Sequence, residues 1–360
     1  MLDNTFCFRD IDSGELLEIE PDTIEPFGLD ALLGTRKEGR PGLPLTMRSA
    51  GVRKGEEHID GNATLTTTIE FNQSPKPYVL VPGGWSPLAL ARARHFLVDR
   101  NVLSLARQLP TDNDHSRLER FRWWWSLLDQ APVSLNPLPA AFEGAQGETL
   151  SYGEFVEEFQ CGVAQLHNAV SHAGVLDLGE VGLQAAYAEV QAVQSRQTRE
   201  IEVLMELCPS VLANTVKRDH RREACEAILA AMRDRSLDPF SLVGLCMMSS
   251  LYRSNSGGDY SIGHRLLKPT PGYKRKDAYN ALSDLRHLEI AALATGIFLD
   301  PPALLTEDIA LAALWSVLRP KGTITAQGCA LILEIDPALF TGLSSDDAER
   351  LVQVLRQHQA

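Results

Sequence analysis

Two acidic residues of this 360-residue chain each follow a short apolar run, where a strand of a sheet would end. Asp99 comes directly after residues 96–98, and Asp308 comes two positions after residues 304–306. Ligands of open parallel sheets bind beyond the carboxyl ends of the strands, so the pair indicates a site for a divalent cation. Each acid alone is equally typical of a helix N-cap or of a first-turn charge.

A third acid, Asp284, lies in the strongest helix pattern of the chain, over residues 277–295. Asp277, Asn280, Asp284 and His287 follow one another at spacings of three, four and three, which places them on one polar stripe of that helix. A solvated helix face would have the same pattern. Short Asp and Asn side chains in an otherwise Ala- and Leu-rich helix are also typical of a surface that faces a metal.

Glu143 is the fourth acid, on a short helix that follows a predicted strand at residues 133–135 and a proline-rich break. Taken alone, it would be a surface residue. Together, four carboxylates from separate elements repel one another and would be stabilised by a metal ion. Phosphodiester hydrolysis uses divalent ions to neutralise the phosphate and to activate water. Glu289, later on the helix of Asp284, is expected to tolerate replacement by Gln with almost no effect.

The order and context of these four motifs resemble those of PIN-domain nucleases. Asp99-x-Asn101-Val-Leu after a strand resembles the opening motif, and the strand, break and short helix with Glu143 resemble the second. The helix with Asp284 looks like the element that carries the third acid. The run at residues 304–311 looks like the fourth motif, a strand followed by an acid.

The resemblance implies a Mg²⁺- or Mn²⁺-dependent nuclease that hydrolyses phosphodiester bonds, of RNA more than of DNA. It implies that the catalytic metal ligands are Asp99, Glu143, Asp284 and Asp308. Supporting polar groups would be Asn101, Asn280, Asp277 and Glu307. Nucleases of this kind often serve as toxins or host-defence effectors, so such a role is also implied.

The fold expected from the resemblance is α/β, a PIN-like three-layer core with a central parallel sheet. Strand patterns at residues 78–81, 95–98, 133–135 and 303–306 alternate with helical ones, as in parallel sheets. Ser86-Pro87 predicts a helix start, and Ser151 with Glu154 predicts a capping box. The expected units are a β-containing extension (1–75), the nuclease core (76–145 with 275–320), a large all-helical insertion (146–274) and a C-terminal segment (321–360).

Two basic clusters interrupt an acidic chain whose formal net charge is −13. That charge argues against bulk coating of nucleic acid but not against local contacts with a phosphate backbone. The cluster before the helix of Asp284 is expected to bind nucleic acid, and it consists of Arg265, Lys268, Lys274, Arg275 and Lys276. A second cluster lies at residues 217–222. Charge runs are also typical of solvated faces, and the three tryptophans at residues 123–125 fit a core or interface better than base stacking.

Composition excludes several protein classes. No apolar run reaches the length of a membrane-spanning helix, and the start of the chain lacks the features of a secretory signal, so a cytoplasmic location is expected. The six scattered cysteines form no CxxC pair and are expected to be small buried residues. The motifs of P-loop, HExxH and GxSxG enzymes are missing.

A different class of function fits the same residues. In this alternative, the chain is a non-catalytic helical interaction protein on a degenerate PIN-like core, with solvated acids and with Asp99 as a helix cap. A protein partner or inhibitor bound through the helical insertion, and a homo-oligomer, fit either alternative. Clustering of the four carboxylates would favour the enzyme, and scattering would favour the interaction protein.

Overall fold

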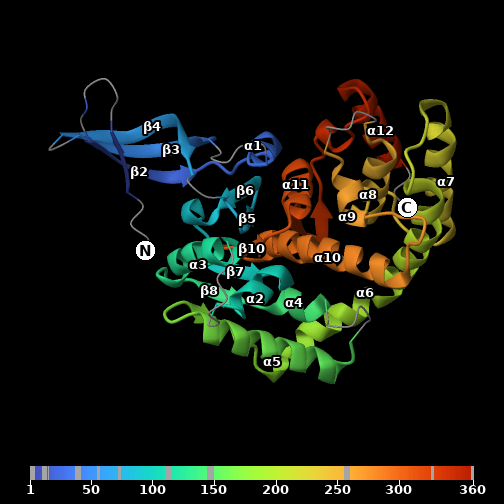
Figure 1. Cartoon of the computed structure of the whole chain (residues 1–360), viewed down its shortest axis with the longest axis horizontal. Helices are drawn as coiled ribbons and strands as arrows, with labels where there is room; N and C mark the ends of the chain where they lie inside the picture. The colour runs from blue at the N-terminus through green and yellow to red at the C-terminus, as the bar shows by residue number, and fades with distance from the viewer. Residues whose placement is uncertain are drawn as a thin grey trace.

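The computed structural model describes residues 5–9, 14, 16–36, 42–54, 57–71, 74–109, 116–143, 150–254, 260–325 and 328–357. It is a mixed α/β protein and is 55% helical. Of the helices in these described ranges, none is both long and apolar enough to cross a bilayer. Figure 1 shows an N-terminal sheet beside a larger body of helices around a second sheet.

The N-terminal sheet is antiparallel, with strand order β1-β2-β3-β4. Its strands are β1 (Phe6–Arg9), β2 (Leu16–Ile24), β3 (Gly42–Lys54) and β4 (Glu57–Glu70), and α1 (Leu29–Gly34) connects β2 to β3. On β3, Leu43, Leu45 and Met47 are buried at alternate positions, as expected for a strand with one face on a core. These elements lie within the residues for which a β-containing extension is predicted.

The second sheet has the order β6-β5-β10-β7-β8-β9 and positions the four acids. The strands are β5 (Tyr78–Val81), β6 (Gly84–Pro87), β7 (His95–Val98), β8 (Ser134–Asn136), β9 (Gly174–Val175) and β10 (Ala303–Thr306). From β10 to β9 the neighbouring strands are parallel, but β5 pairs antiparallel with both β10 and β6. The predicted central parallel sheet is therefore a mixed sheet.

The helix predicted to start at Ser86-Pro87 is wrong, because these residues form the edge strand β6. Gly83, at a φ of +90°, allows the tight turn that pairs β6 with β5. Gly84 lies so close to Phe27 that an added Cβ would stand 2.3 Å from its carbonyl oxygen. An edge strand tolerates Pro87, since no further strand needs its missing N–H.

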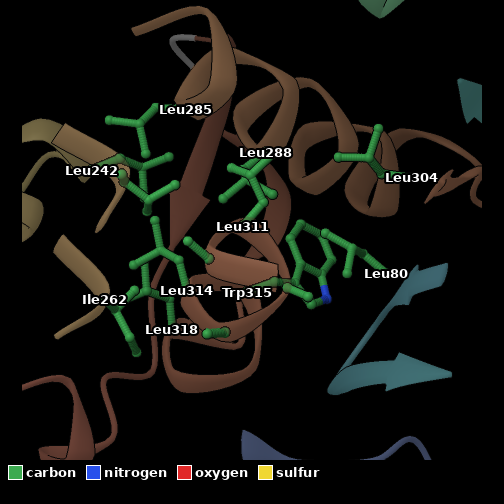
Figure 2. Close-up of a cluster of buried hydrophobic side chains, with 14 of the residues drawn as sticks. Leu80, Leu242, Ile262, Leu285, Leu288, Leu304, Leu311, Leu314, Trp315 and Leu318 are labelled. Atoms are coloured by element: carbon green, nitrogen blue, oxygen red, sulfur yellow. The ribbon is translucent and has the colours of Figure 1, made fainter. Parts of the chain in front are cut away.

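Helices cover both faces of this sheet (Figure 1), and α11 (Ile309–Leu318) is almost entirely buried. All its residues from 310 to 318 are buried. Figure 2 shows its leucines and Trp315 packed against Leu288 of α10 (Arg275–Ile297) and Leu304 of β10. Trp315 Nε1 donates a hydrogen bond of 2.7 Å to the Val81 carbonyl oxygen, which fixes α11 to the antiparallel part of the sheet.

Three further helices lie between the parallel strands in the chain, and one of them carries the three tryptophans at residues 123–125. They are α2 (Arg100–Ala106), α3 (Ser116–Asp129) and α4 (Leu138–Glu143). On α3, Trp124 and Trp125 are buried in the core, whereas Trp123 is 45% exposed. Of the cysteines, Cys208, Cys225 and Cys246 are buried and the other three are exposed, so the expectation of six buried cysteines is wrong for half of them.

The segment predicted as an all-helical insertion contains a strand of the main sheet. Its helices are α5 (Tyr152–Ala169), α6 (Glu180–Leu207), α7 (Arg221–Asp234), α8 (Leu242–Leu251) and α9 (Ile262–Leu267). The capping box of Ser151 and Glu154 starts α5 as predicted. After α5, β9 pairs in parallel with β8, so α5 is a crossover helix of the sheet and the prediction of an all-helical segment is wrong.

The C-terminal segment packs against the end of α10. It forms the hairpin of β11 (Lys321–Thr325) and β12 (Gly328–Ile332), followed by α12 (Ser345–Gln357). At the crossing of α10 and β11, a Cβ on Gly296 would lie 2.4 Å from the Gly322 carbonyl carbon. Glycine at both positions therefore allows the two backbones to touch.

Candidate metal centre

Asp99 lies at the junction of β7 and α2 and is 1% exposed. Its backbone N–H donates to the Leu305 carbonyl oxygen at 3.1 Å, which extends the pairing of β7 with β10 by one residue. Its carboxylate makes no capping hydrogen bond to α2. Instead, Oδ2 accepts a 2.7 Å hydrogen bond from Thr306 Oγ1. The interpretation of Asp99 as a helix cap is therefore wrong for its side chain.

His287 reaches Asp99 from α10 and is fully buried. Its Nε2 lies 2.8 Å from the Pro139 carbonyl oxygen, to which an Nε2–H would donate. Its Nδ1 lies 3.4 Å from Asp99 Oδ1. Both of these atoms are buried and have no hydrogen-bond partner among the described residues. Two opposed, unsatisfied polar atoms in the interior are uncommon in folded proteins and suit a ligand between them.

Glu143, at the end of α4, is the third member of this group. One ligand atom each of Asp99, Glu143 and His287 lies within 4.8 Å of the others. The helix of Glu143 starts where the Asn136 side chain accepts a 2.9 Å hydrogen bond from the Leu138 N–H. The predicted proline-rich break after β8 therefore fixes where α4, and with it Glu143, begins. Arg100 Nε lies 3.5 Å from Glu143, and its guanidinium also binds Glu158 at 3.1 Å.

Asp284 lies three residues before His287 on α10 and is partly buried. Burial, together with the negative charges of Asp99 and Asp308, raises the pKa of Asp284 to about 8. Glu143 contributes in the same direction, whereas His287 opposes the shift. The four predicted acids therefore lie close enough to influence the ionisation of one carboxyl group.

Asp308 has the same strand-then-acid context as Asp99 but a different local role. Its Oδ1 accepts hydrogen bonds from the N–H groups of Ala310 and Leu311, so it is the N-cap of α11. Its own N–H donates to Thr306 Oγ1 at 3.0 Å. Thr306 therefore joins the two acids, with Asp99 on one side and Asp308 on the other. Asp308 also lines an open cavity of about 440 Å³.

The supporting residues divide between this cavity and the surface. Asn101 and Glu307 line the cavity beside Asp308. Asn280 is exposed on α10. The Asp277 carboxylate accepts a 2.8 Å hydrogen bond from the Lys274 N–H at the start of α10, so it serves that helix terminus and is not among the clustered donors.

Basic side chains surround the cavity from three segments of the chain. Lys268, predicted to bind nucleic acid, lines the cavity together with Lys76 and Arg120, which were not predicted. Lys274, Arg275 and Lys276 are exposed in the first turn of α10 and do not line it. The fifth predicted residue, Arg265, is exposed beside the ring of Tyr260.

The charges within the donor group favour a cation at its centre. Burial opposes ionisation of Asp99, but contacts with His287 and Thr306 outweigh it and hold the pKa of Asp99 below its ordinary value. Burial lowers the pKa of His287, yet Asp99 and Glu143 reverse the shift and raise it. For Glu143, burial is the largest cause and raises the pKa. The carboxylates around His287 thus favour positive charge at the centre of the group, which a metal ion would supply.

The donor group fits a small divalent ion in chemistry and nearly in size. Two carboxylates and one imidazole nitrogen are all metal ligands, and Pro139 holds the ring as outer-sphere acceptors do. Metal–ligand bonds of about 2.0–2.2 Å place the ligand atoms about 3–4 Å apart. The group, spread over at most 4.8 Å, would close slightly on an ion.

A buried network of ion pairs lies beside this group, across a cavity of about 40 Å³. Glu289 binds Arg196 at 2.6 Å and Arg286 at 3.1 Å, and Arg196 also lies 3.6 Å from the buried Glu200. The expectation that replacing Glu289 is nearly silent did not include these ion pairs. Breaking a partly buried pair leaves its partner uncompensated.

The sequence placed His287 on the stripe of Asp284 but did not assign it a role. Its distance of three residues from Asp284 was the available signal, since such residues are neighbours on a helix. No pattern indicated Lys76 or Arg120, because only the packing of α3 and the segment before β5 brings them to Asp308. Comparisons of the chain with protein-family models, curated proteins and solved structures found no match.

Proposed function

We propose that this protein is a divalent-metal-dependent nuclease that hydrolyses phosphodiester bonds. The observation that carries the proposal is the convergence of Asp99, Glu143 and His287 within 4.8 Å. Asp99 Oδ1 and His287 Nδ1 have no hydrogen-bond partner among the described residues. These residues come from separate elements, and the strands that position them are parallel neighbours. Such a group has no evident packing role, because it buries charge in the core at a cost in free energy.

The residues divide into buried donors and acids nearer to solvent. Asp99 and His287 would hold the ion, while Thr306 and Pro139 fix their orientation. Glu143 completes the donor group, and Asp284 and Asp308 lie outside it. All three are partly exposed, so a substrate can reach them. A divalent ion, when bound, neutralises the charge of the phosphate and activates a water molecule for attack. Mg²⁺ or Mn²⁺ is the proposed cofactor, and the imidazole donor favours Mn²⁺.

The cavity at Asp308 supports a nucleic acid as substrate. Lys76, Arg120 and Lys268 line it together with Asn101, so a phosphate backbone would meet positive charge beside the acids. The choice of RNA over DNA follows from the resemblance to PIN-domain nucleases, as do the PIN-like core and a toxin or host-defence role. The cytoplasmic location is proposed from the sequence pattern alone. The mixed sheet with its four parallel neighbours is compatible with that resemblance.

One observation favours the non-catalytic alternative. Arg100 pairs with Glu143, and the Asp308 carboxylate caps α11, so two of the four acids have structural partners without a metal. In that alternative His287 remains an imidazolium ion paired with Asp99. The metal site is favoured over it because Oδ1 and Nδ1 lie 3.4 Å apart without a hydrogen bond between them or to another described residue.

Hydrolysis of mixed RNA and DNA in Mn²⁺, beside an Asp99→Asn control, tests the proposal. We expect the wild-type protein to cleave at least one substrate and EDTA to abolish cleavage. The control should be inactive because it loses a ligand charge at the centre of the group. A purified protein that binds neither ion and cleaves neither nucleic acid would favour the interaction protein.

A further inference from the structure

A buried tyrosine with two arginines lies next to the proposed site and has no role in it. The guanidinium carbon of Arg36 lies 4.7 Å from the ring centroid of Tyr260, and that of Arg265 lies 4.4 Å from it. Arg36 follows α1, and Arg265 belongs to α9. Figure 1 shows α11, whose N-cap is Asp308, between these two helices.

The two guanidinium groups carry positive charge that the described part of the chain does not neutralise. Within that part, neither Arg36 nor Arg265 forms an ion pair, and both side chains are exposed. Each guanidinium carbon lies within 5 Å of the same ring centroid, so the two like charges are no more than 9.1 Å apart. Such a pair repels itself in the free protein and is stabilised by an anion.

The Tyr260 hydroxyl adds a hydrogen-bond donor at the same place. The residue is 7% exposed, and its hydroxyl is buried without a hydrogen-bond partner among the described residues. A buried hydroxyl normally finds a partner. Guanidinium groups and a hydroxyl are hydrogen-bond donors, and phosphate oxygens accept from such donors.

The position of this group relates it to the proposed substrate cavity. Burial raises the pKa of Tyr260 to about 12, and Asp308 is near enough to add to the rise while Arg265 opposes it. Lys268, three residues after Arg265, lines the cavity of Asp308. Helix α9 therefore carries Arg265 of this group and ends at Lys268 of the cavity lining.

We propose that Arg36, Tyr260 and Arg265 bind a second, non-scissile phosphate of the substrate, so that the protein acts on polynucleotides in preference to single phosphodiesters. This inference rests on the proposed function and names its substrate class. It also gives the N-terminal extension and α9 a shared role, because each supplies one arginine. The test below measures binding without metal, so its outcome does not depend on hydrolysis.

The binding experiment uses the full chain and a short 5′-fluorescein-labelled RNA in EDTA, followed by fluorescence anisotropy at several salt concentrations. We expect Arg36→Gln with Arg265→Gln to weaken binding by about tenfold or more. The slope of log K against log salt should fall by about 1.4, since each lost contact with a single strand contributes about 0.7. Tyr260→Phe, which removes only the hydroxyl, should weaken binding less and leave the salt slope unchanged.

The matched control is Arg222→Gln, an exposed arginine of α7 paired with Glu226. It makes the same charge change as each single replacement, away from the cavity of Asp308, and should bind as the wild type does. The proposal would be overturned if the double variant had the RNA affinity, the salt slope and the melting temperature of the wild type. If the double variant does not fold, the single variant Arg36→Gln decides, and unchanged binding in it overturns the proposal equally.

Hydrolysis provides a second readout that separates the two proposals. With Mn²⁺, the double variant should lose activity on RNA. It should still hydrolyse bis(p-nitrophenyl) phosphate, which has one phosphodiester, as fast as the wild type does. Equal losses on both substrates would contradict a second phosphate site. If no variant hydrolyses either substrate while the binding difference stands, the nuclease proposal fails and the anion site remains.

Discussion

Nδ1 of His287 faces Oδ1 of Asp99 at 3.4 Å, and both atoms are buried without another partner among the described residues. The imidazole is held from behind by Pro139, and the carboxylate by Thr306. Each side chain is therefore oriented by one neighbour and leaves one donor atom free. Glu143 completes the group from a third element. The predictions below follow from this arrangement and from the charges around it.

Metal binding should stabilise the folded chain. Because the donors converge only in the folded state, an ion at about 100 times its Kd adds about 2.7 kcal/mol to the free energy of unfolding. We expect millimolar Mn²⁺ to raise the melting temperature by about 2–4 °C or more. Asp99→Asn and His287→Gln should each abolish the shift. A melting temperature indifferent to Mn²⁺ and Mg²⁺ in the wild type would contradict a metal centre.

Asp284→Asn should separate activity from stability. The pKa of Asp284 is raised to about 8, above that of the unfolded chain. Ionisation therefore destabilises the folded state increasingly from about pH 4 to pH 8. The amide removes this effect, so the metal-free variant should melt higher than the wild type at pH 8 and the two should converge near pH 4. Hydrolysis should fall by orders of magnitude, because a charge near the ion is lost.

Its control is Asp300→Asn, an exposed residue after α10. Glu289 is unsuitable because it pairs with Arg196 and Arg286. Full activity in Asp284→Asn, in a preparation where Asp99→Asn is inactive, would exclude Asp284 from the site.

Arg100→Gln should expose the repulsion between the acids. The guanidinium pairs with Glu143 and Glu158, so its loss leaves Glu143 near Asp99 without a compensating charge. We expect a lower melting temperature in EDTA but a larger rise on adding Mn²⁺, since the ion replaces the lost positive charge. Calorimetric melting with and without metal measures both. An equal metal shift in variant and wild type would show that Arg100 does not act on the metal centre.

Glu200→Gln should change how stability depends on pH. Burial, opposed by Arg196 and reinforced by Glu289, raises the pKa of Glu200 to about 7 from 4.5. The folded state then binds a proton more tightly than the unfolded one, and the wild type loses stability as the pH rises from about 4.5 to 7. The loss is of order 3 kcal/mol and constant above pH 7. Urea unfolding at pH 5 and 8 should show a flatter dependence for the variant.

The cavity residues should matter more for nucleic-acid binding than the first turn of α10. Replacing Lys76, Arg120 and Lys268 with Ala should weaken RNA binding more than replacing residues 274–276, because only the first group lines the cavity of Asp308. Both triple variants remove three positive charges, so bulk electrostatics is matched. Anisotropy titrations in EDTA give the comparison. A larger loss in the residue 274–276 variant would place the backbone along α10 instead.

Local sequence determined the elements that carry the acids. The apolar runs before Asp99 and before Glu307 form β7 and β10, and the Ala- and Leu-rich stripe around Asp284 forms α10, because short-range hydrophobic periodicity fixes strand and helix formation. The strand at residues 78–81 was also predicted, but its antiparallel direction was not. Strand direction depends on which neighbours pair, and no local pattern records that.

Only the tertiary structure distinguished the two strand-ending acids. Asp99 and Asp308 have the same local context, yet Asp308 caps α11 while the Asp99 carboxylate faces His287. The difference arises because α10 packs against β10 and α4 and brings an imidazole to one acid only. The same holds for Arg36 and Arg265, which are more than 200 positions apart in the chain and meet at Tyr260. Spacing along the chain determines what one helix or strand presents, whereas packing between elements decides which side chains share a site.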